Sequence, residues 1–283
     1  MRKLFYAIAL LLTSCSILPA QSVNKIIARH LKALGVVDRQ RAIKTVRLTQ
    51  RADTGDPADN FDFTVMRKRG NRFREEEPAS VPVNEMKGAE PSVPVPTREK
   101  GEIGGCDGQT SWSKYAGNPA KIGLGYCDGA ADIDGPLMDY KKKGFSVVLV
   151  GKETIEGQEL YHLKVTGTKT APSVHFYLDA KTFLLARIIT ENHGRHQEDV
   201  YSDCREVDGI MVAFCDEMRF WTVQDDPELE DKVASPRVGE ESRQKQIVER
   251  IEFNVPLDDS LFAIPADAVD GTAVKNPSKR TIL

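Results

Sequence analysis

The most regular pattern of apolar and polar positions lies between Asp134 and Ile189. Within the run Leu160–Thr166, Leu163 and Val165 alternate with polar residues. The neighbouring β-prone runs, separated by turn residues, are Phe145–Val150, Val174–Leu178 and Phe183–Thr190. Strands of this length at this spacing predict an antiparallel meander with one apolar and one solvated face.

The mature chain is predicted to begin with an amphipathic helix. Ser22 can cap it and Gly35 can end it. Its apolar positions keep helical spacing: Val23, Ile26, Ile27, Leu31 and Leu34. His30 is placed near the polar side, where we expect a solvated residue rather than a ligand.

Two strands, Val46–Arg51 and Phe61–Lys68, are predicted next. Phe61, Phe63 and Val65 form the apolar face of the second strand. A turn at Arg69-Gly70-Asn71 then leads into Arg72–Glu75. The basic residues of this hairpin are Arg67, Lys68, Arg69, Arg72 and Arg74, and we interpret them as charges on a solvated face rather than as an anion site.

The C-terminal half contains a strong hairpin signal, Asp208-Gly209, between two β-prone runs. A last strand is predicted at Gln246–Val255, with Ile247, Ile251 and Phe253 on one face. A capped turn at 256–262 follows it. With a further helix near 130–143, the chain is expected to form about ten strands.

The domain organisation follows from these elements. Residues 1–20 form a predicted signal peptide, residues 21–265 one β-rich domain, and residues 266–283 a flexible tail. The proline-rich stretch 78–97 and the acidic stretch 224–242 are expected to be exposed insertions.

The N-terminus carries two positive charges, an apolar run and then small residues, which is typical of an export signal. Two cleavage sites are open. A lipobox ending at Cys15 would give a lipid-anchored protein, whereas cleavage before Gln21 would give a free periplasmic one, and we favour the latter.

Four cysteines remain in the exported chain, and an even set in an oxidising compartment predicts two disulfides. Local pairing, Cys106 with Cys127 and Cys204 with Cys215, is expected. The second pair is difficult, because a two-residue turn leaves Cys215 diagonal to Cys204, near the limit for bridging. A bulge or crossed pairing would resolve this.

Catalytic and cofactor motifs are absent from the sequence. It contains no nucleophile elbow, zinc-protease motif or dinucleotide fingerprint, so we expect neither an enzyme nor a cofactor. His193 and His196 are interpreted as residues of a solvated turn rather than metal ligands. The formal net charge of −3 argues against nucleic-acid binding.

Four segments carry a family resemblance: GPLMDYKKKGFSVVLVGKETIEGQELYHLKVT, YLDAKTFLLARI, SDCREVDGIMVAF and IVERIEFNVPLDDSLFAIP. Together they resemble the outer-membrane lipoprotein-sorting (LolA/LolB-like) family, most strongly over residues 134–265. No cargo-handling arginine of that family can be placed in this sequence. The long insertions and the four cysteines also depart from its pattern.

The resemblance implies a mainly β fold with some α, a curved antiparallel sheet forming an incomplete barrel covered by helices. It implies an apolar cavity, for which the lining candidates are Phe61, Phe63, Val65, Val165, Phe176, Ile251 and Phe253. The function expected is binding of lipid or lipoprotein acyl chains, with membrane association left open. The alternative is a module that binds a protein partner and has no lipid cargo.

Overall fold

The computed structural model describes residues 22–57, 60–77, 101–123, 127, 132–167, 173–192, 195–223 and 237–271 of the 283-residue chain. The signal segment 1–20, both cleavage sites, the stretch 78–97 and residues 272–283 lie outside these ranges. No helix among the described residues is long and apolar enough to cross a membrane.

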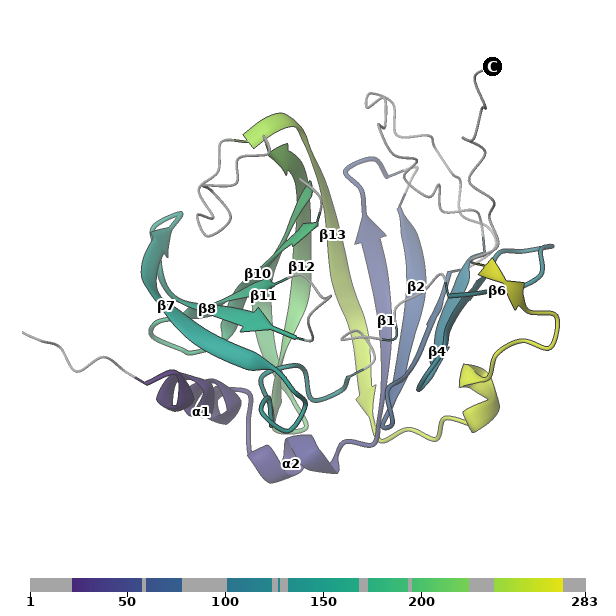
Figure 1. Cartoon of the computed structure of the whole chain (residues 1–283), viewed down its shortest axis with the longest axis horizontal. Helices are drawn as coiled ribbons and strands as arrows, with labels where there is room; N and C mark the ends of the chain where they lie inside the picture. Colours follow the sequence, from purple (N-terminus) through teal and green to yellow (C-terminus); the bar gives the residue numbers. More distant parts are fainter. Residues whose placement is uncertain are drawn as a thin grey trace, which may run out of the picture.

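The described strands form one curved, unclosed sheet (Figure 1), so the predicted fold class is confirmed. Its strand order is β14-β6-β5-β4-β3-β2-β1-β13-β12-β11-β10-β9-β8-β7. All neighbours pair antiparallel except β14 and β6. The bounds are β1 Thr45–Asp53, β2 Phe61–Lys68, β3 Arg72–Glu76, β4 Ile103–Asp107, β5 Ser111–Lys114, β6 Lys121–Ile122, β7 Ser146–Ile155, β8 Gln158–Thr166, β9 Val174–Asp179, β10 Leu185–Asn192, β11 Arg195–Val207, β12 Ile210–Val223, β13 Arg237–Phe253 and β14 Val269–Asp270.

The predicted first helix is confirmed as α1, Val23–Ala33, and is followed by α2, Val37–Ala42. Ile26 and Ile27 of α1 are buried against apolar side chains of β7, β8 and β9. Gly35 joins the two helices with a φ of 127°, which a side chain would disfavour. There the chain pairs with the start of β12, because Met211 N–H donates to the Leu34 carbonyl at 2.8 Å.

The strand register gives the sheet two distinct faces. Residues directly opposite each other on neighbouring strands share a face. The register therefore shows which residues of successive strands lie on the same face of the sheet. We call the side that packs against α1 the helix face. Its opposite face is covered over β2–β5 by the 3-10 turn η2, Asp259–Phe262, whose Phe262 is buried with Met66 and Leu257.

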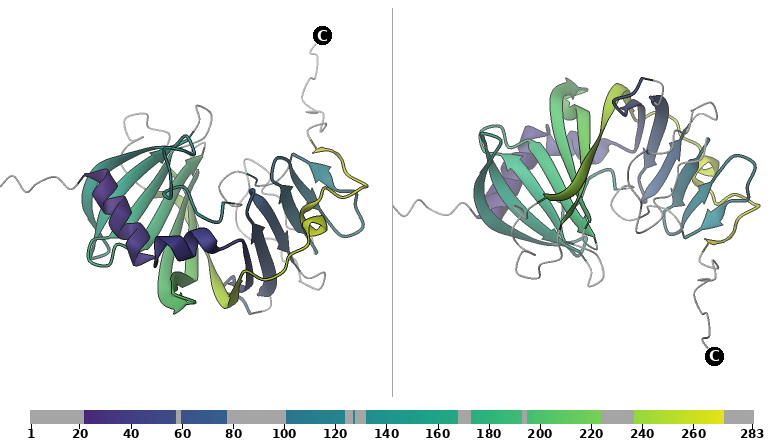
Figure 2. Two further views of the ribbon diagram at one scale, coloured as in Figure 1. Left: turned by 90° about the horizontal axis from the view of Figure 1, so that it is seen from below. Right: turned by 90° about the horizontal axis from the view of Figure 1, so that it is seen from above.

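The sheet is strongly rolled, as the two views in Figure 2 show. At the β7–β8 end the sheet rolls toward the opposite face. This brings Glu156 in the β7–β8 turn into ion pairs with Arg187 of β10 and Arg219 of β12. Near β1 it curves toward the helix face. Arg67 of β2 and Tyr201 of β11 interact electrostatically, although four strand spacings separate them. In a flat sheet these strands would be about 19 Å apart, so the sheet must curve toward this face.

Several sequence predictions need correction. The stretch 133–144 forms a chain of turns and not a helix, because Gly135-Pro136 interrupts it. The described sheet has fourteen strands rather than about ten. Residues 237–242 belong to β13, and 269–270 to β14, so neither the insertion nor the tail is wholly irregular.

Candidate ligand-binding face

All seven predicted cavity-lining residues lie on the helix face. Five belong to an apolar cluster over β1–β4 and the β11–β12 hairpin: Phe61, Phe63, Val65, Ile251 and Phe253. The other two, Val165 and Phe176, belong to a second apolar cluster over β7–β9 beneath α1. A bulge in β13 opposite Thr49 and Gln50 shifts the alternation. Val248 therefore joins Ile251 and Phe253, whereas Ile247 points to the opposite face and is exposed.

A polar band separates the two apolar clusters on the same face. It consists of polar side chains on the helix face of β11, β12 and β13, with one arginine from β2: Asp199, Tyr201, Asp216, Gln244, Gln246 and Arg67. Met218 lies among them. Tyr201 lies directly opposite Asp216, and Asp199 directly opposite Met218. The helix face is thus apolar at both ends and polar in the middle.

The band is poorly solvated, and this perturbs its titrating groups. Burial raises the pKa of the Asp216 carboxyl to about 7, with repulsion from Asp199 adding to the effect. Burial likewise raises the pKa values of Asp199 and of the Tyr201 phenol. Burial lowers the pKa of Arg67, although Tyr201 and nearby carboxylates favour its charged form. Clusters of perturbed groups of this kind are found preferentially at functional sites.

Three side-chain atoms in the band are buried without a hydrogen-bond partner among the described residues. They are Arg67 Nε, Asp216 Oδ1 and Gln244 Nε2. Other atoms of the band are paired: Gln197 Nε2 donates to Asp199 Oδ1 at 2.8 Å. Burying an unpaired polar atom is costly, so such atoms need a specific explanation.

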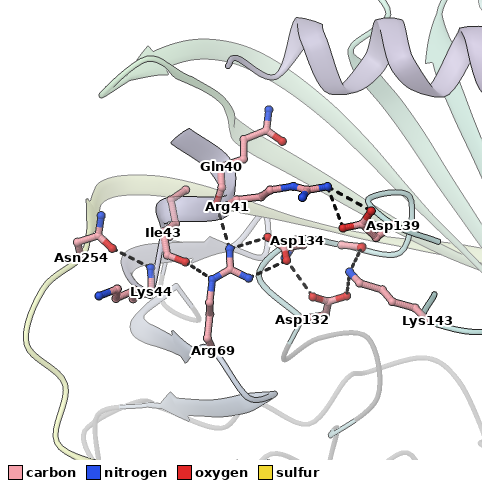
Figure 3. A network of polar contacts seen from close by, with 11 residues as sticks. Gln40, Arg41, Ile43, Lys44, Arg69, Asp132, Asp134, Asp139, Lys143 and Asn254 are labelled. Atoms are coloured by element: carbon pink, nitrogen blue, oxygen red, sulfur yellow. Dashed lines mark hydrogen bonds and ion pairs between the residues drawn. The ribbon is translucent and has the colours of Figure 1, made fainter. Parts of the chain in front are cut away.

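Cys127 and Ile133 pack against the β1–β4 cluster, and we call the described residues 127 and 132–134 the covering segment. This segment is fixed at two points. The Cys106–Cys127 disulfide attaches residue 127 to the helix face of β4, which confirms the first predicted pair. Arg69 makes the second attachment, a two-point ion pair with Asp134 (Figure 3). Its Nε and Nη2 also donate to the carbonyls of Ile43 and Gln40, at 2.5 and 3.1 Å. Arg69 therefore holds α2 and the covering segment to the β2–β3 turn.

The second predicted disulfide is not formed, and Cys204 and Cys215 are free thiols. The hairpin has the expected register, in which Cys204 faces Ala213 and Cys215 faces Ser202. The two cysteines are therefore diagonal, about 7–8 Å apart for such positions, which exceeds the usual bridging distance.

A second polar cluster is buried on the opposite face of β7–β12. His162 makes hydrogen bonds to Glu153 at 2.6 Å and to His175 at 2.7 Å. Arg187 pairs with Glu198 at 2.7 Å and with the Glu156 carboxylate. Because these charges have close partners within the sheet, we regard the cluster as structural.

The histidines differ from the sequence predictions. His30 is buried, and its Nδ1 lies 2.8 Å from the Phe183 carbonyl, so it is not a solvated residue. His196 is buried beside Trp221 on the opposite face rather than in a solvated turn, and His193 lies outside the described residues. Among the described residues, no group of three or more His, Cys, Asp or Glu side chains could hold a metal ion.

Two important residues were not found from the sequence. Arg67 and Arg69 were interpreted as solvated charges, yet one lies in the polar band and the other fixes the covering segment. A signal existed for Arg67, because it follows Phe63 and Val65 at the period of two that marks the apolar face. No local pattern marked Arg69, whose partners are distant in sequence.

Comparison with known proteins supports the fold. No protein-family model and no curated protein sequence matches the chain. A LolA superfamily protein from Nitrosomonas europaea is similar in structure, with a TM-score of 0.51 and 14% identity, over 86% of this chain and 98% of the other. A DUF1329 family protein from Desulfovibrio piger has a TM-score of 0.49 and 14% identity, over 86% and 97% of the two chains. The resemblance predicted from the sequence is thus confirmed for the fold, and this chain is similar in architecture to the LolA superfamily.

Proposed function

We propose that this protein is an exported carrier or receptor that holds the apolar chain of a lipid, or of a lipid-modified protein, against the helix face of its sheet. The observation that supports this most directly is the partial solvent exposure of Phe61, Ile251 and Phe253. These large apolar side chains pack against the β1–β4 cluster, yet each stays partly accessible. Accessible apolar surface beside a covering segment is where a hydrophobic ligand can be buried.

The energetics favour measurable binding. Each CH₂ group of an acyl chain removed from water contributes about 0.8 kcal/mol, so partial insertion of one chain is sufficient. The second apolar cluster is less available, because α1 already packs on Val165 and Phe176. We therefore place the chain over β1, β2 and β13.

Export to the periplasm is part of the proposal. The Cys106–Cys127 disulfide fits an oxidising compartment, and the N-terminal sequence has the pattern of an export signal. Intact mass of the exported product distinguishes a chain that begins at Gln21 from one lipidated at Cys15.

A titration with a fluorescent fatty-acid probe tests the binding proposal. Ile251→Trp fills the accessible surface and should weaken binding by about tenfold or more. Ile247→Trp is the matched control, since Ile247 lies on the opposite face of the same strand. Folded wild-type protein that binds no probe, and yields no lipid on organic extraction, would contradict the proposal.

One observation favours a protein-binding function as the second candidate. Among the described strands β7 ends the sheet, and it exposes Val148 and Val150, at 56% and 49%. An exposed apolar edge can accept an extended peptide as an additional strand. Val148→Lys should abolish capture of such a peptide and leave probe binding unchanged.

A further inference from the structure

The polar band has a composition that apolar packing alone does not explain. Arg67 Nε and Gln244 Nε2 are buried donors without a hydrogen-bond partner among the described residues, and the buried Asp216 Oδ1 also lacks one there. All three belong to the helix face. Asp216 and Gln244 lie between the two apolar clusters, whereas Arg67 comes from β2 at the border of the first cluster and interacts with Tyr201 of the band. An apolar chain on this face would bring its polar end to this band.

The charges of the band argue against a charged polar end. A phosphate or carboxylate would gain from Arg67 but would lie close to Asp199 and Asp216. An ammonium would be attracted by these carboxyls but repelled by Arg67. Burial also penalises any ionised group that lacks a full set of partners. These opposing effects leave an uncharged group as the best match.

The hydrogen-bonding capacity of the band points the same way. Two unpaired donors match ester or hydroxyl oxygens. The Asp216 carboxyl can accept from a hydroxyl when ionised and donate when protonated, and at neutral pH both forms are present because its pKa is about 7. A group with hydroxyls and an ester offers both kinds of partner.

We propose that the polar band recognises an uncharged ester- and hydroxyl-bearing head group, as in a glycerol monoester, and that Arg67, Asp216 and Gln244 select it over charged head groups. This inference rests on the proposed function, because it assigns the polar end of the ligand whose apolar chain lies over β1, β2 and β13. It also explains why polar atoms are retained in the middle of an otherwise apolar face.

The test compares four probes with the same twelve-carbon chain, each displacing the fluorescent fatty acid from the full exported chain. They are glycerol monododecanoate, dodecanoate, dodecyl phosphate and dodecylamine. We expect the glycerol ester to bind at least about tenfold more tightly than each of the other three. Any charged probe that binds as tightly as the glycerol ester, or more tightly, would overturn the inference.

Substitutions in the polar band test which residues provide the head-group selectivity. Asp216→Leu and Arg67→Met should each reduce the preference for the glycerol ester by at least about tenfold. Ser202→Leu is the control, because Ser202 is exposed on the opposite face, next to Tyr201 on β11. Thermal unfolding checks that each variant is folded, and if one is not, the wild-type ranking of the four probes decides.

The outcomes separate this inference from the proposed function. If no twelve-carbon probe binds to the wild type, the proposed function fails and the inference with it. If all the probes bind but the ranking is flat, or is unchanged in folded Asp216→Leu and Arg67→Met, the function stands and the head-group selection is rejected.

Discussion

Arg69 and Asp134 form a two-point ion pair, with Nη1–Oδ2 and Nη2–Oδ1 distances of 2.7 and 2.8 Å, between the β2–β3 turn and the covering segment beside the β1–β4 cluster. Arg69 also donates to the carbonyls of Gln40, in the last turn of α2, and of Ile43, the residue that follows the helix. One guanidinium therefore connects three parts of the chain that are distant in sequence.

Arg69→Met should lower the free energy of unfolding by roughly 2–3 kcal/mol, because it leaves Asp134 and two carbonyls without their charged donor. Arg69→Lys should recover part of this loss, since an ammonium cannot reproduce the planar fork. The exposed pair Arg51–Asp62 provides the control, and Arg51→Met should cost less than about 1 kcal/mol. Urea unfolding gives these values, and equal losses at both sites would contradict the connecting role of Arg69.

Gly35→Ala should destabilise the junction between α1 and α2. An added Cβ would lie 2.3 Å from the Gly209 carbonyl oxygen, so the β11–β12 turn would have to move. Gly117 also has a positive φ, but a Cβ added there would meet no neighbouring atom within 4 Å, so Gly117→Ala measures backbone strain alone, about 1 kcal/mol. We expect Gly35→Ala to cost about 1–2 kcal/mol more than Gly117→Ala in thermal unfolding.

Local patterns were sufficient for much of this fold. Helical spacing identified α1, and Asp208-Gly209 identified the β11–β12 turn, because both depend on residues close in sequence. His30 could have been placed better, since it lies four residues after Ile26 and three after Ile27, on the buried stripe. Its carbonyl partner, Phe183, is 153 residues away and has no sequence signature.

The polar band and the covering segment were harder to predict, because both depend on contacts between residues that are distant in sequence. The bulge in β13 shifts the alternation by one residue, and a shift of one exchanges the two faces. The band itself joins β2 to β11 only because the sheet curves. Curvature is a property of the whole sheet, which alternation within a single strand does not reveal.

The disulfide assignment gives a chemical prediction. Alkylation of the unreduced, unfolded protein should label Cys204 and Cys215 but not Cys106 or Cys127. Replacing both Cys106 and Cys127 with serine should cost about 3 kcal/mol, because the loop between them, with a sequence separation of 21, loses its constraint in the unfolded chain. Peptide mapping that finds Cys204 joined to any other cysteine would contradict this assignment.

Breaking the buried Arg187–Glu198 pair on the opposite face should cost more stability than breaking an exposed ion pair. The Arg187 and Glu198 side chains are both 4% exposed, so Arg187→Met leaves a buried carboxylate with less compensation and should cost about 3–5 kcal/mol. The double change Arg187→Met with Glu198→Leu should cost less than the single change, because the buried carboxylate, which retains a longer ion pair to Arg219 at 3.4 Å, is removed as well. Additive losses in the double variant would show that the pair is not coupled.

Asp216 should make stability depend on pH near neutrality. Its pKa is about 7 in the folded chain and near 3.8 when unfolded, so the folded state binds the proton more tightly. This contribution is fully present below pH 4 and is lost as pH rises through 7. Because the side chain keeps some access to solvent, we expect a loss of about 1–2 kcal/mol from this group between pH 5 and pH 8, below the ~3 kcal/mol that the full shift would give over this interval. Asp216→Asn removes the ionisation, so unfolding measured at both pH values should show a smaller loss in the variant. An identical pH dependence in wild type and Asp216→Asn would mean that the carboxyl is better solvated than its position on the helix face implies.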